Sequence, residues 1–196
     1  MYDGFVNAAI EVFGKQRVVV DRYHVSKLYR NALDQLRIKE MKCLKESLSA
    51  EQYAELDGMM WILRKKHECL NQTEKEALKK LYDHSPTLKQ AHQLALKLTH
   101  IFNTHDDRKK AMAKIDRWIS QVEKNDLTCF NTFIKTLQKH QSSIANYFKK
   151  RATSGFVEGL NNKIKVIKRR CYGFFKTESL FQRLTLDLTG YRLLGI

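Results

Sequence analysis

The stretch from residue 155 to residue 170 reads Gly155-Phe-Val-Glu158-Gly-Leu-Asn161-Asn162-Lys163-Ile-Lys165-Val-Ile-Lys168-Arg169-Arg170. At roughly 100° per residue, a helix formed by this stretch gathers apolar side chains on one face. That face carries Leu160, Ile164, Ile167 and Cys171. A second strip lies within about 60° of Glu158 on the same helix, so one acid stands among amides and cations. The strip carries Asn161, Asn162, Lys165 and Arg169.

An acid among these cations is poorly placed for phosphate binding unless a cation stands between acid and phosphate. A divalent metal held by Glu158 would resolve the conflict, with Lys165 and Arg169 contacting a DNA backbone around it. The alternative is a solvated amphipathic helix, in which Glu158 caps the helix or pairs with Asn162 or Lys163. The spacing alone leaves both interpretations open.

The composition favours a helical protein with a polyanionic partner. The 196 residues are 43% hydrophobic with a single proline, which argues for a helix-rich globular protein of one or two domains. Lys and Arg number 36 against 21 Asp and Glu, and the net charge of +15 favours nucleic acid as the partner. No apolar run approaches the roughly 18 residues of a membrane span, and the start of the chain lacks a secretory signal, so a cytoplasmic protein is expected.

The cysteines and tryptophans are expected to be packed side chains. Cys43, Cys69, Cys129 and Cys171 are far apart and form no Cys-x-x-Cys pair. Reduced, mostly packed thiols are therefore expected rather than a zinc site or a redox couple. Trp61 and Trp118 fall within predicted helices and are expected to anchor a core.

The first twenty residues predict a helix followed by a strand. The helix covers residues 2–13 and ends at Gly14. Its predicted buried face carries Phe5, Ala8, Ala9 and Val12. Arg17-Val18-Val19-Val20-Asp21 is a β-branched run that suits a strand buried on both sides. No second convincing strand follows, so its sheet partners are expected upstream of this chain.

A block of about 125 residues after this strand has helical periodicity throughout. A long helix is predicted over about 25–44, and Ser49 precedes another that runs to about Arg64. Thr73 and Glu76 have capping-box spacing, and Pro86 marks a further helix start. Residues 153–155 predict a junction before the helix of Glu158, residues 172–175 predict a turn after it, and Thr177 can cap a final helix.

Asp21 is a second candidate acid. It lies at the predicted carboxyl end of a strand, where α/β folds gather ligand and metal groups, and His24 follows within one turn. Asp21 can equally be the N-cap of the next helix, and His24 a partly buried polar residue. Phosphodiester chemistry on DNA commonly uses two metals about 4 Å apart, bridged by carboxylates. Such a site usually takes three acids, and Asp3 is a weaker third candidate.

Three segments of the chain together resemble one known family. They are Val18-Val19-Val20-Asp21-Arg22-Tyr23-His24-Val25, Val157-Glu158-Gly159-Leu160-Asn161-Asn162-Lys163-Ile164-Lys165 and Lys168-Arg169-Arg170-Cys171-Tyr172-Gly173-Phe174. These segments resemble the back half of an insertion-sequence transposase, of the DDE type known as ISL-three. The resemblance runs from Met1 to the end of the chain.

The resemblance implies a ribonuclease-H-like catalytic domain, in which acids on two strands and a glutamate on a late helix bind two magnesium ions. Glu158 matches that glutamate. Asp21 matches a strand-end acid beside the site, with His24 as a supporting residue. Both essential aspartates of the family, and its end-recognition regions, would lie upstream of Met1. An amino-terminally truncated transposase is therefore expected.

The expected fold is mostly α, a partial ribonuclease-H-like fold with one strand and a large helical insertion. Residues 1–25 would form the partial ribonuclease-H-like segment, with a helix and the last strand. Residues 26–152 would form the helical insertion. Residues 153–196 would form the helix of Glu158 and a C-terminal helix.

The expected function is that of a transposase fragment. The complete enzyme would cleave and join transposon-end DNA by metal-dependent phosphoryl transfer, with Glu158 and Asp21 as catalytic residues and ligands of Mg²⁺ or Mn²⁺. The fragment alone would be inactive, and homo-oligomer formation stays open. The alternative is a noncatalytic basic helical DNA-binding protein. The residues expected to contact DNA are Asn161, Asn162, Lys163, Lys165, Lys168, Arg169 and Arg170.

Overall fold

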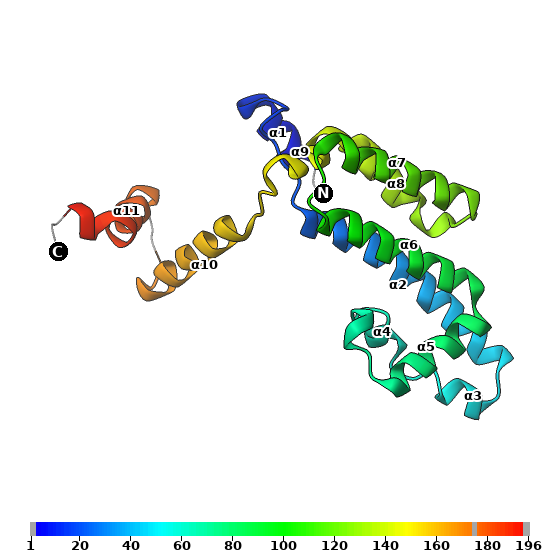
Figure 1. The fold of residues 1–196 in the computed structure, drawn as a ribbon. Coiled ribbons are helices and arrows are strands. Elements are labelled where there is room, and N and C mark those ends of the chain that lie inside the picture. The colour runs from blue at the N-terminus through cyan, green and yellow to red at the C-terminus, as the bar shows by residue number, and fades with distance from the viewer. Residues whose placement is uncertain (1–2, 174–175, 194–196) are drawn as a thin grey trace. The chain divides into compact units, whose positions relative to one another are not determined.

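A computed structural model describes residues 3–173 and 176–193, and every regular element among them is a helix (Figure 1). This confirms the mostly α class. The chain divides into two compact units, Met1–Ala152 and Thr153–Ile196. The first unit contains α1 (Asp3–Phe13), α2 (Arg22–Ser47), α3 (Ala50–Ala54), α4 (Met59–Ile62), η1 (His67–Cys69), α5 (Gln72–His84), α6 (Pro86–Asn103), α7 (Arg108–Lys124), η2 (Thr128–Phe130), α8 (Asn131–Lys139) and α9 (Gln141–Lys150). The second contains α10 (Gly155–Arg170) and α11 (Thr177–Leu193).

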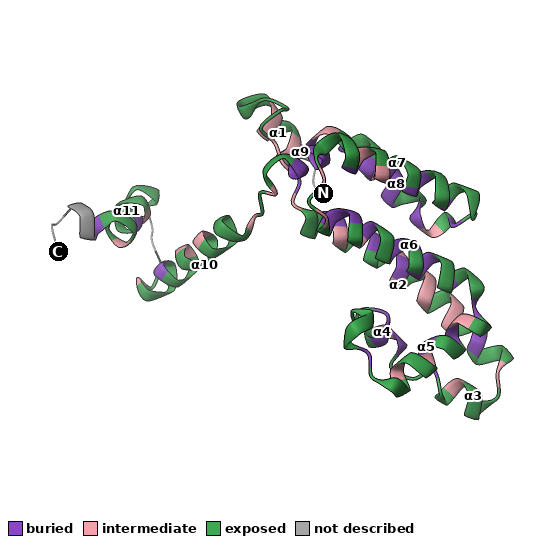
Figure 2. Cartoon of the chain, viewed as in Figure 1, coloured by how far each residue is buried: buried purple, intermediate pink, exposed green. Residues whose placement is uncertain are grey.

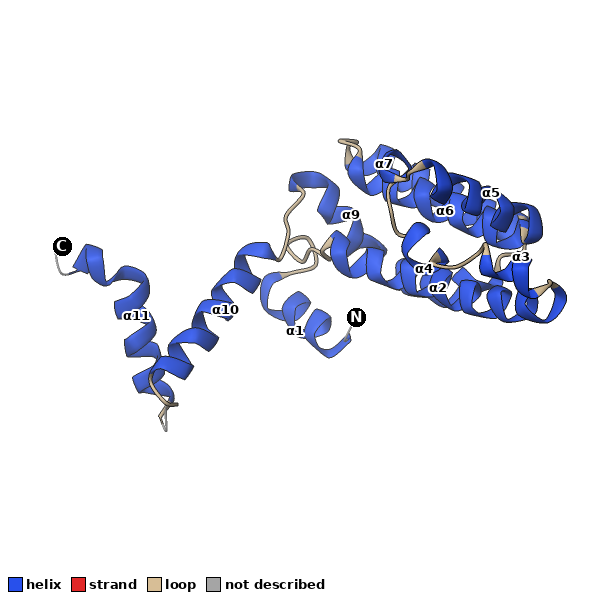
Figure 3. Cartoon of the chain, turned by 90° about the horizontal axis from the view of Figure 1, so that it is seen from below, coloured by secondary structure: helices blue, strands red, loops and turns tan. Residues whose placement is uncertain are grey.

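The predicted strand is absent, and Figure 3 shows only helices and loops in the described residues. The segment before α2 instead contacts α9, which takes up backbone groups that a sheet would have paired. The Val20 N–H donates to the Ser143 carbonyl at 3.1 Å. The buried Asn146 amide donates to the carbonyls of Lys15 at 3.1 Å and Val18 at 2.9 Å. The extended backbone before α2 is therefore held by a helix and not by a β ladder.

Helix α1 ends where the sequence predicts, because Gly14 adopts φ +79° just beyond it. The prediction of its buried face is wrong for two described side chains. Ala8 is exposed, and Val12 keeps 72% of its surface exposed. The side chain of Phe5 lies outside the described residues. The spacing identified a helix, but a helical spacing does not supply a neighbour to cover the apolar face.

Two capped helices begin after polar side chains, one of them at an unexpected position. Ser49, which the sequence placed just before a helix, forms the N-cap of α3 in a capping box with Gln52. The predicted box of Thr73 and Glu76 is wrong, because Asn71 and Glu74 form it two residues earlier. Asn71 Oδ1 accepts from the Glu74 N–H at 2.8 Å, and the Glu74 carboxylate accepts from the Asn71 N–H at 3.1 Å. Both pairs have the same three-residue spacing, so the spacing alone could not distinguish them.

The helix predicted from Ser49 to about Arg64 is broken into two short pieces. Helix α3 ends at Ala54, and the chain turns through Gly58, at φ +73°, before α4. This break turns Trp61 outward, so the tryptophan is 62% exposed and is not a core anchor. The Arg64 guanidinium lies over its ring, 5.8 Å from the centroid. The buried side chains around the break are Leu56, Met59, Ile62 and Leu63.

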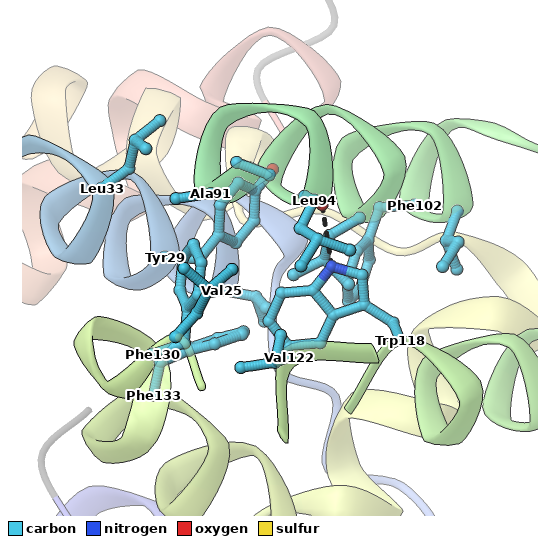
Figure 4. Packing of buried hydrophobic residues seen from close by; sticks show 14 of the residues in the cluster. Val25, Tyr29, Leu33, Ala91, Leu94, Phe102, Trp118, Val122, Phe130 and Phe133 are labelled. Carbon is cyan, nitrogen blue, oxygen red and sulfur yellow. Dashed lines mark hydrogen bonds between the residues drawn. The ribbon is translucent and has the colours of Figure 1, made fainter. Parts of the chain in front are cut away.

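The core of the first unit lies where α2, α6, α7 and α8 face one another (Figure 2). Trp118 is 2% exposed, and its indole meets the rings of Phe130 and Phe133 edge to face at 5.5 and 5.8 Å (Figure 4). Its Nε1–H donates to the Leu94 carbonyl at 2.8 Å, which satisfies the polar atom that a buried tryptophan carries. The predicted anchoring role of Trp118 is confirmed.

A buried histidine fixes the chain between α4 and α5 to α6. His92 Nε2 lies 3.0 Å from the Leu63 carbonyl, and Nδ1 lies 2.7 Å from the Tyr82 hydroxyl. Because a carbonyl only accepts, Nε2 must carry the proton, and Nδ1 then accepts from the tyrosine. Burial lowers the pKa of His92 from 6.5, and the bond to Leu63 opposes this shift. The neutral ring therefore joins three elements of the first unit.

An arginine joins the end of α9 to the end of α6. Arg151 adopts φ +51°, and its guanidinium donates to the carbonyls of Thr104 and Phe102, both at 2.6 Å. It also lies over the ring of Tyr147, 5.3 Å from the centroid. The last carbonyls of a helix have no partners within the helix and carry partial negative charge. Arg151 supplies these carbonyls with hydrogen-bond donors and with a positive charge. It does so just before the junction to the second unit.

The four thiols are free, and the expectation that most are packed is wrong. Cys43 and Cys69 are exposed, while Cys129 and Cys171 are partly buried. Burial raises the pKa of Cys129 to about 11. None of the described helices is long and apolar enough to cross a membrane.

Candidate functional site

Helix α10 forms over the residues that the sequence predicted, with its apolar and polar strips on different sides. Ile167 is buried, and the other members of the apolar face, Leu160, Ile164 and Cys171, are partly buried. Helix α11 packs on α10 within the second unit, and its Leu184 is buried as well. The polar strip faces solvent: Glu158, Asn161, Asn162, Lys165 and Arg169 are all exposed. The 3.6-residue period therefore predicted the two faces correctly.

Glu158 lies in the first turn of α10, where the helix dipole favours a negative charge. Its Oε1 accepts a hydrogen bond from the Ser154 hydroxyl at 2.7 Å, and its backbone N–H donates to the Ser154 carbonyl at 2.8 Å. The carboxylate is therefore held by the residue before the helix and not by Asn162 or Lys163. This contact orients Glu158 and leaves its side chain exposed.

The basic side chains of α10 lie on different sides of the helix. Lys163 Nζ donates to the Asp187 carbonyl of α11 at 3.3 Å, which directs this lysine toward the packed side. Lys165 and Arg169 lie on the strip of Glu158, and no described carboxylate lies within ion-pair distance of either. Lys168, Arg169 and Arg170 occupy the last turn, where cations stabilise the negative end of the dipole. The strip thus combines one acid with cations available to a ligand.

Asp21 acts as the N-cap of α2 in the first unit. Its Oδ1 accepts from the Tyr23 N–H at 2.8 Å, as the capping alternative requires. His24 is exposed on the first turn of α2, and its ring meets the Tyr23 ring edge to face at 5.8 Å. A capping role and a role beside a reaction centre are compatible, because an ionised carboxylate can accept several hydrogen bonds.

The described residues do not by themselves form a metal-binding set. Among them no group of three or more His, Cys, Asp or Glu side chains could hold a metal ion. Glu158 belongs to the second unit and Asp21 to the first. Two acids fall short of the three carboxylates that a two-metal site usually needs. The two candidates therefore fit a metal centre only as parts of a larger set.

One feature that the sequence patterns did not predict is a basic groove in the first unit. Arg30, Asp34 and Arg37 line it from α2, and Arg64 and Lys66 line it from the chain after α4. Residues 30, 34 and 37 are spaced by four and three positions, which places them on one helix face. This spacing is the feature of the sequence that could have indicated part of the groove. Residues 64 and 66 line the same groove only because the chain folds back onto this part of the first unit, which no local pattern predicts.

A family model identifies the family of this chain, and two curated relatives are similar to it. The model of the DDE transposase family of the ISL3 type, described as transposase, matches residues 1–184. The transposase for insertion sequence element IS1001 of Bordetella parapertussis is 25% identical over 174 residues, which are 88% of this chain and 42% of that protein. The transposase for insertion sequence element IS1557 of Mycobacterium tuberculosis is 26% identical over 142 residues, 72% of this chain and 32% of that protein. No solved structure matches.

The chain spans less than half the length of these curated relatives. The family match nevertheless covers nearly all of its 196 residues, including both candidate acids and the whole of α10. The chain therefore belongs to the ISL-three (ISL3) family of DDE transposases.

Proposed function

We propose that this chain supplies the late glutamate, Glu158, and part of the DNA-binding surface of a ribonuclease-H-like transposase. The complete protein would cleave and join transposon-end DNA by phosphoryl transfer. The observation that carries the proposal is the exposed polar strip of α10, where Glu158 stands among Asn161, Lys165 and Arg169. The family membership and the exposure of the cations around this oriented carboxylate together support the proposal.

The roles that we propose for the three segments of the chain are those that the family resemblance implies. Residues 1–25 would adjoin the catalytic sheet, residues 26–152 would form the helical insertion, and residues 153–196 would carry the glutamate. Mg²⁺ or Mn²⁺ would stabilise the attacking and leaving oxygens in the complete site. Glu158 would be one ligand, with Asp21 and His24 beside it. Because the described residues form no complete metal set, no cleavage step is assigned to this chain alone.

The cations of α10 would contact the DNA backbone. Lys165 and Arg169 are the strongest candidates, because both are exposed on the strip of Glu158. Asn161 and Asn162 can donate to phosphate oxygens, and Lys168 and Arg170 extend the positive charge. Lys163 would contribute less while it donates to α11. Backbone contacts position DNA without reading sequence, so weak sequence preference is expected.

Duplex binding tests the proposal directly. Lys165→Ala and Arg169→Ala should each weaken binding to a random duplex more than Lys79→Ala, which removes an exposed lysine from α5. If about six phosphates are contacted, the slope of log affinity against log salt should be near −5 for the unaltered chain. Equal effects of all three substitutions, or a flat salt response, would remove the special role of α10.

The role of Glu158 separates a transposase from a noncatalytic DNA-binding protein. Glu158→Gln should bind duplex as well as the unaltered chain or slightly better, because it removes a negative charge from a basic strip. In a full-length transposase that contains this chain, Glu158→Gln should abolish cleavage and leave DNA binding intact. Unchanged cleavage in that variant would make Glu158 a structural residue.

A further inference from the structure

The first unit contains a groove that the proposed role of α10 does not use. Its walls are α2, α6 and the chain from Met60 to Glu68, and its volume is about 830 Å³. Two carboxylates face it, those of Asp34 and Glu68. Six cationic side chains line it: Arg22, Arg30, Arg37, Arg64, Lys65 and Lys66. The excess of positive charge indicates an anionic ligand.

The groove is held in shape by specific contacts. Asp34 accepts from Arg37 Nε at 2.8 Å and from Arg64 at 3.2 Å, so one carboxylate joins α2 to the chain beyond α4. His92 anchors the same chain through the Leu63 carbonyl at 3.0 Å. Side chains fixed in this way lose little freedom when a ligand binds.

Two of the cations are available to a ligand. Arg22 donates to the Asn103 side chain, and Lys65 pairs with Glu74. Arg30 and Lys66 are exposed, and among the described residues no carboxylate lies within ion-pair distance of either. These two side chains come from different elements that line the groove, α2 and the chain after α4. A phosphate-bearing strand lying in the groove could contact both.

Exposed aromatic rings accompany these cations. Tyr23 lines the groove and is 61% exposed, while Trp61 is 62% exposed beside the groove residue Arg64. Tyr23 and Asp34, which pairs with Arg64, are separated by about 16 Å along α2. Aromatic rings beside a basic groove are typical of surfaces that bind unpaired nucleic acid, because every base can stack on them.

We propose that this groove binds an unpaired DNA strand, with phosphates on Arg30 and Lys66 and bases stacked on Trp61 or Tyr23. The proposal rests on the proposed function, since it takes DNA as the ligand. An intact duplex is a poorer fit, because its bases are stacked on each other and cannot reach the rings.

The test compares binding of an oligothymidylate of about twelve nucleotides with that of a duplex of equal length. Arg30→Ala/Lys66→Ala should weaken single-strand binding about tenfold and reduce the log-log salt slope by about 1.4, for two lost phosphate contacts. The matched control is Lys109→Ala/Lys135→Ala, which removes two exposed lysines of the same unit outside the groove. Trp61→Ala should weaken binding about fivefold, and Trp61→Phe should retain most of it.

Tryptophan fluorescence gives an independent readout. Added single strand should quench Trp61, and Trp61→Phe should remove the quenching, since Trp118 is buried. Equal losses in the two double variants, or an equal loss of duplex and single-strand binding on changing Arg30 and Lys66, would overturn the proposal. Failure of Lys165→Ala and Arg169→Ala to weaken duplex binding would count against the proposed role of α10 and leave the groove result standing.

Discussion

The two units differ in how completely they bury their apolar side chains. In the first unit Tyr29, Trp118 and Phe130 are at most 2% exposed and lie in one continuous core. In the second unit Ile167 and Leu184 are the buried large apolar residues among those described, while Phe156 remains 81% exposed. Figure 2 shows α10 almost entirely exposed. The first unit thus has a continuous apolar core, whereas helix α10 of the second unit leaves most of its surface exposed.

The largest expected effect comes from the core of the first unit. Trp118→Ala should lower the free energy of unfolding by about 3–5 kcal/mol, because it leaves a cavity against Phe130 and Phe133. Trp61→Ala is the matched control and should change stability little, since that ring is mostly exposed. Chemical denaturation measures both. Similar losses in the two variants would contradict the exposed position of Trp61.

Arg151 is the next test, because it stands at the boundary between the units. Arg151→Ala should lower the free energy of unfolding of the first unit by about 2 kcal/mol, through loss of the bonds to Thr104 and Phe102. Arg151→Lys keeps the charge but cannot reproduce the two-point contact, so it should recover less than half of the loss. Full recovery in the lysine variant would show that charge alone stabilises the end of α6.

The pH dependence of stability should also come from the first unit. His92 has a folded pKa below 6.5, so the unfolded chain takes up its proton first as pH falls. Neutral His92 makes its full contribution to the free energy of unfolding above pH 6.5. This contribution is lost as the pH falls below 6.5, and the free energy of unfolding then changes by at most about 1.4 kcal/mol per pH unit. His92→Gln should flatten this region of the stability profile, whereas the exposed His67→Gln should not. A profile that both variants leave unchanged would exclude His92 as its source.

The smallest effect is a difference in thiol reactivity. Cys129, in the first unit, has a pKa raised to about 11 from 9.0, which leaves about 100-fold less thiolate at neutral pH than an unshifted thiol would have. Labelling by a disulfide reagent should therefore be fast at Cys43 and Cys69 and slowest at Cys129. Mass spectrometry of the labelled peptides measures the order. Labelling of Cys129 as fast as that of Cys43 would indicate that its surroundings open readily.

Helix positions were largely predictable because they depend on neighbours along the chain. The faces of α6, α7 and α10 follow a 3.6-residue period, and Pro86 and Gly14 bound helices through their own backbone geometry. The spacing of capping residues gave the wrong helix start where two pairs had the same spacing. Asn71 and not the predicted Thr73 caps α5. The strand at Val18–Asp21 failed for another reason, since β-branched residues favour extended backbone but a strand needs a partner.

The candidate site was predictable only to the extent that it lies on one helix. Glu158 and its strip are separated by one to three turns of α10, so periodicity alone places them together. The assignment of Asp21 and Glu158 to one metal centre stays a prediction from the family. The basic groove was missed, because Arg30 and Lys66 are 36 positions apart and meet only when α2 and the chain after α4 pack on α6.

The sequence by itself determined the helical class, the basic charge, the two faces of α10 and the membership of a transposase family. These properties depend on composition, on short-range periodicity and on matching residues. Tertiary structure alone decided that Trp61 is exposed while Trp118 is buried, that Arg151 holds the end of α6, and that Asp34 organises a basic groove. Burial and charge pairing between distant residues depend on which helices pack together, and no local pattern specifies that packing.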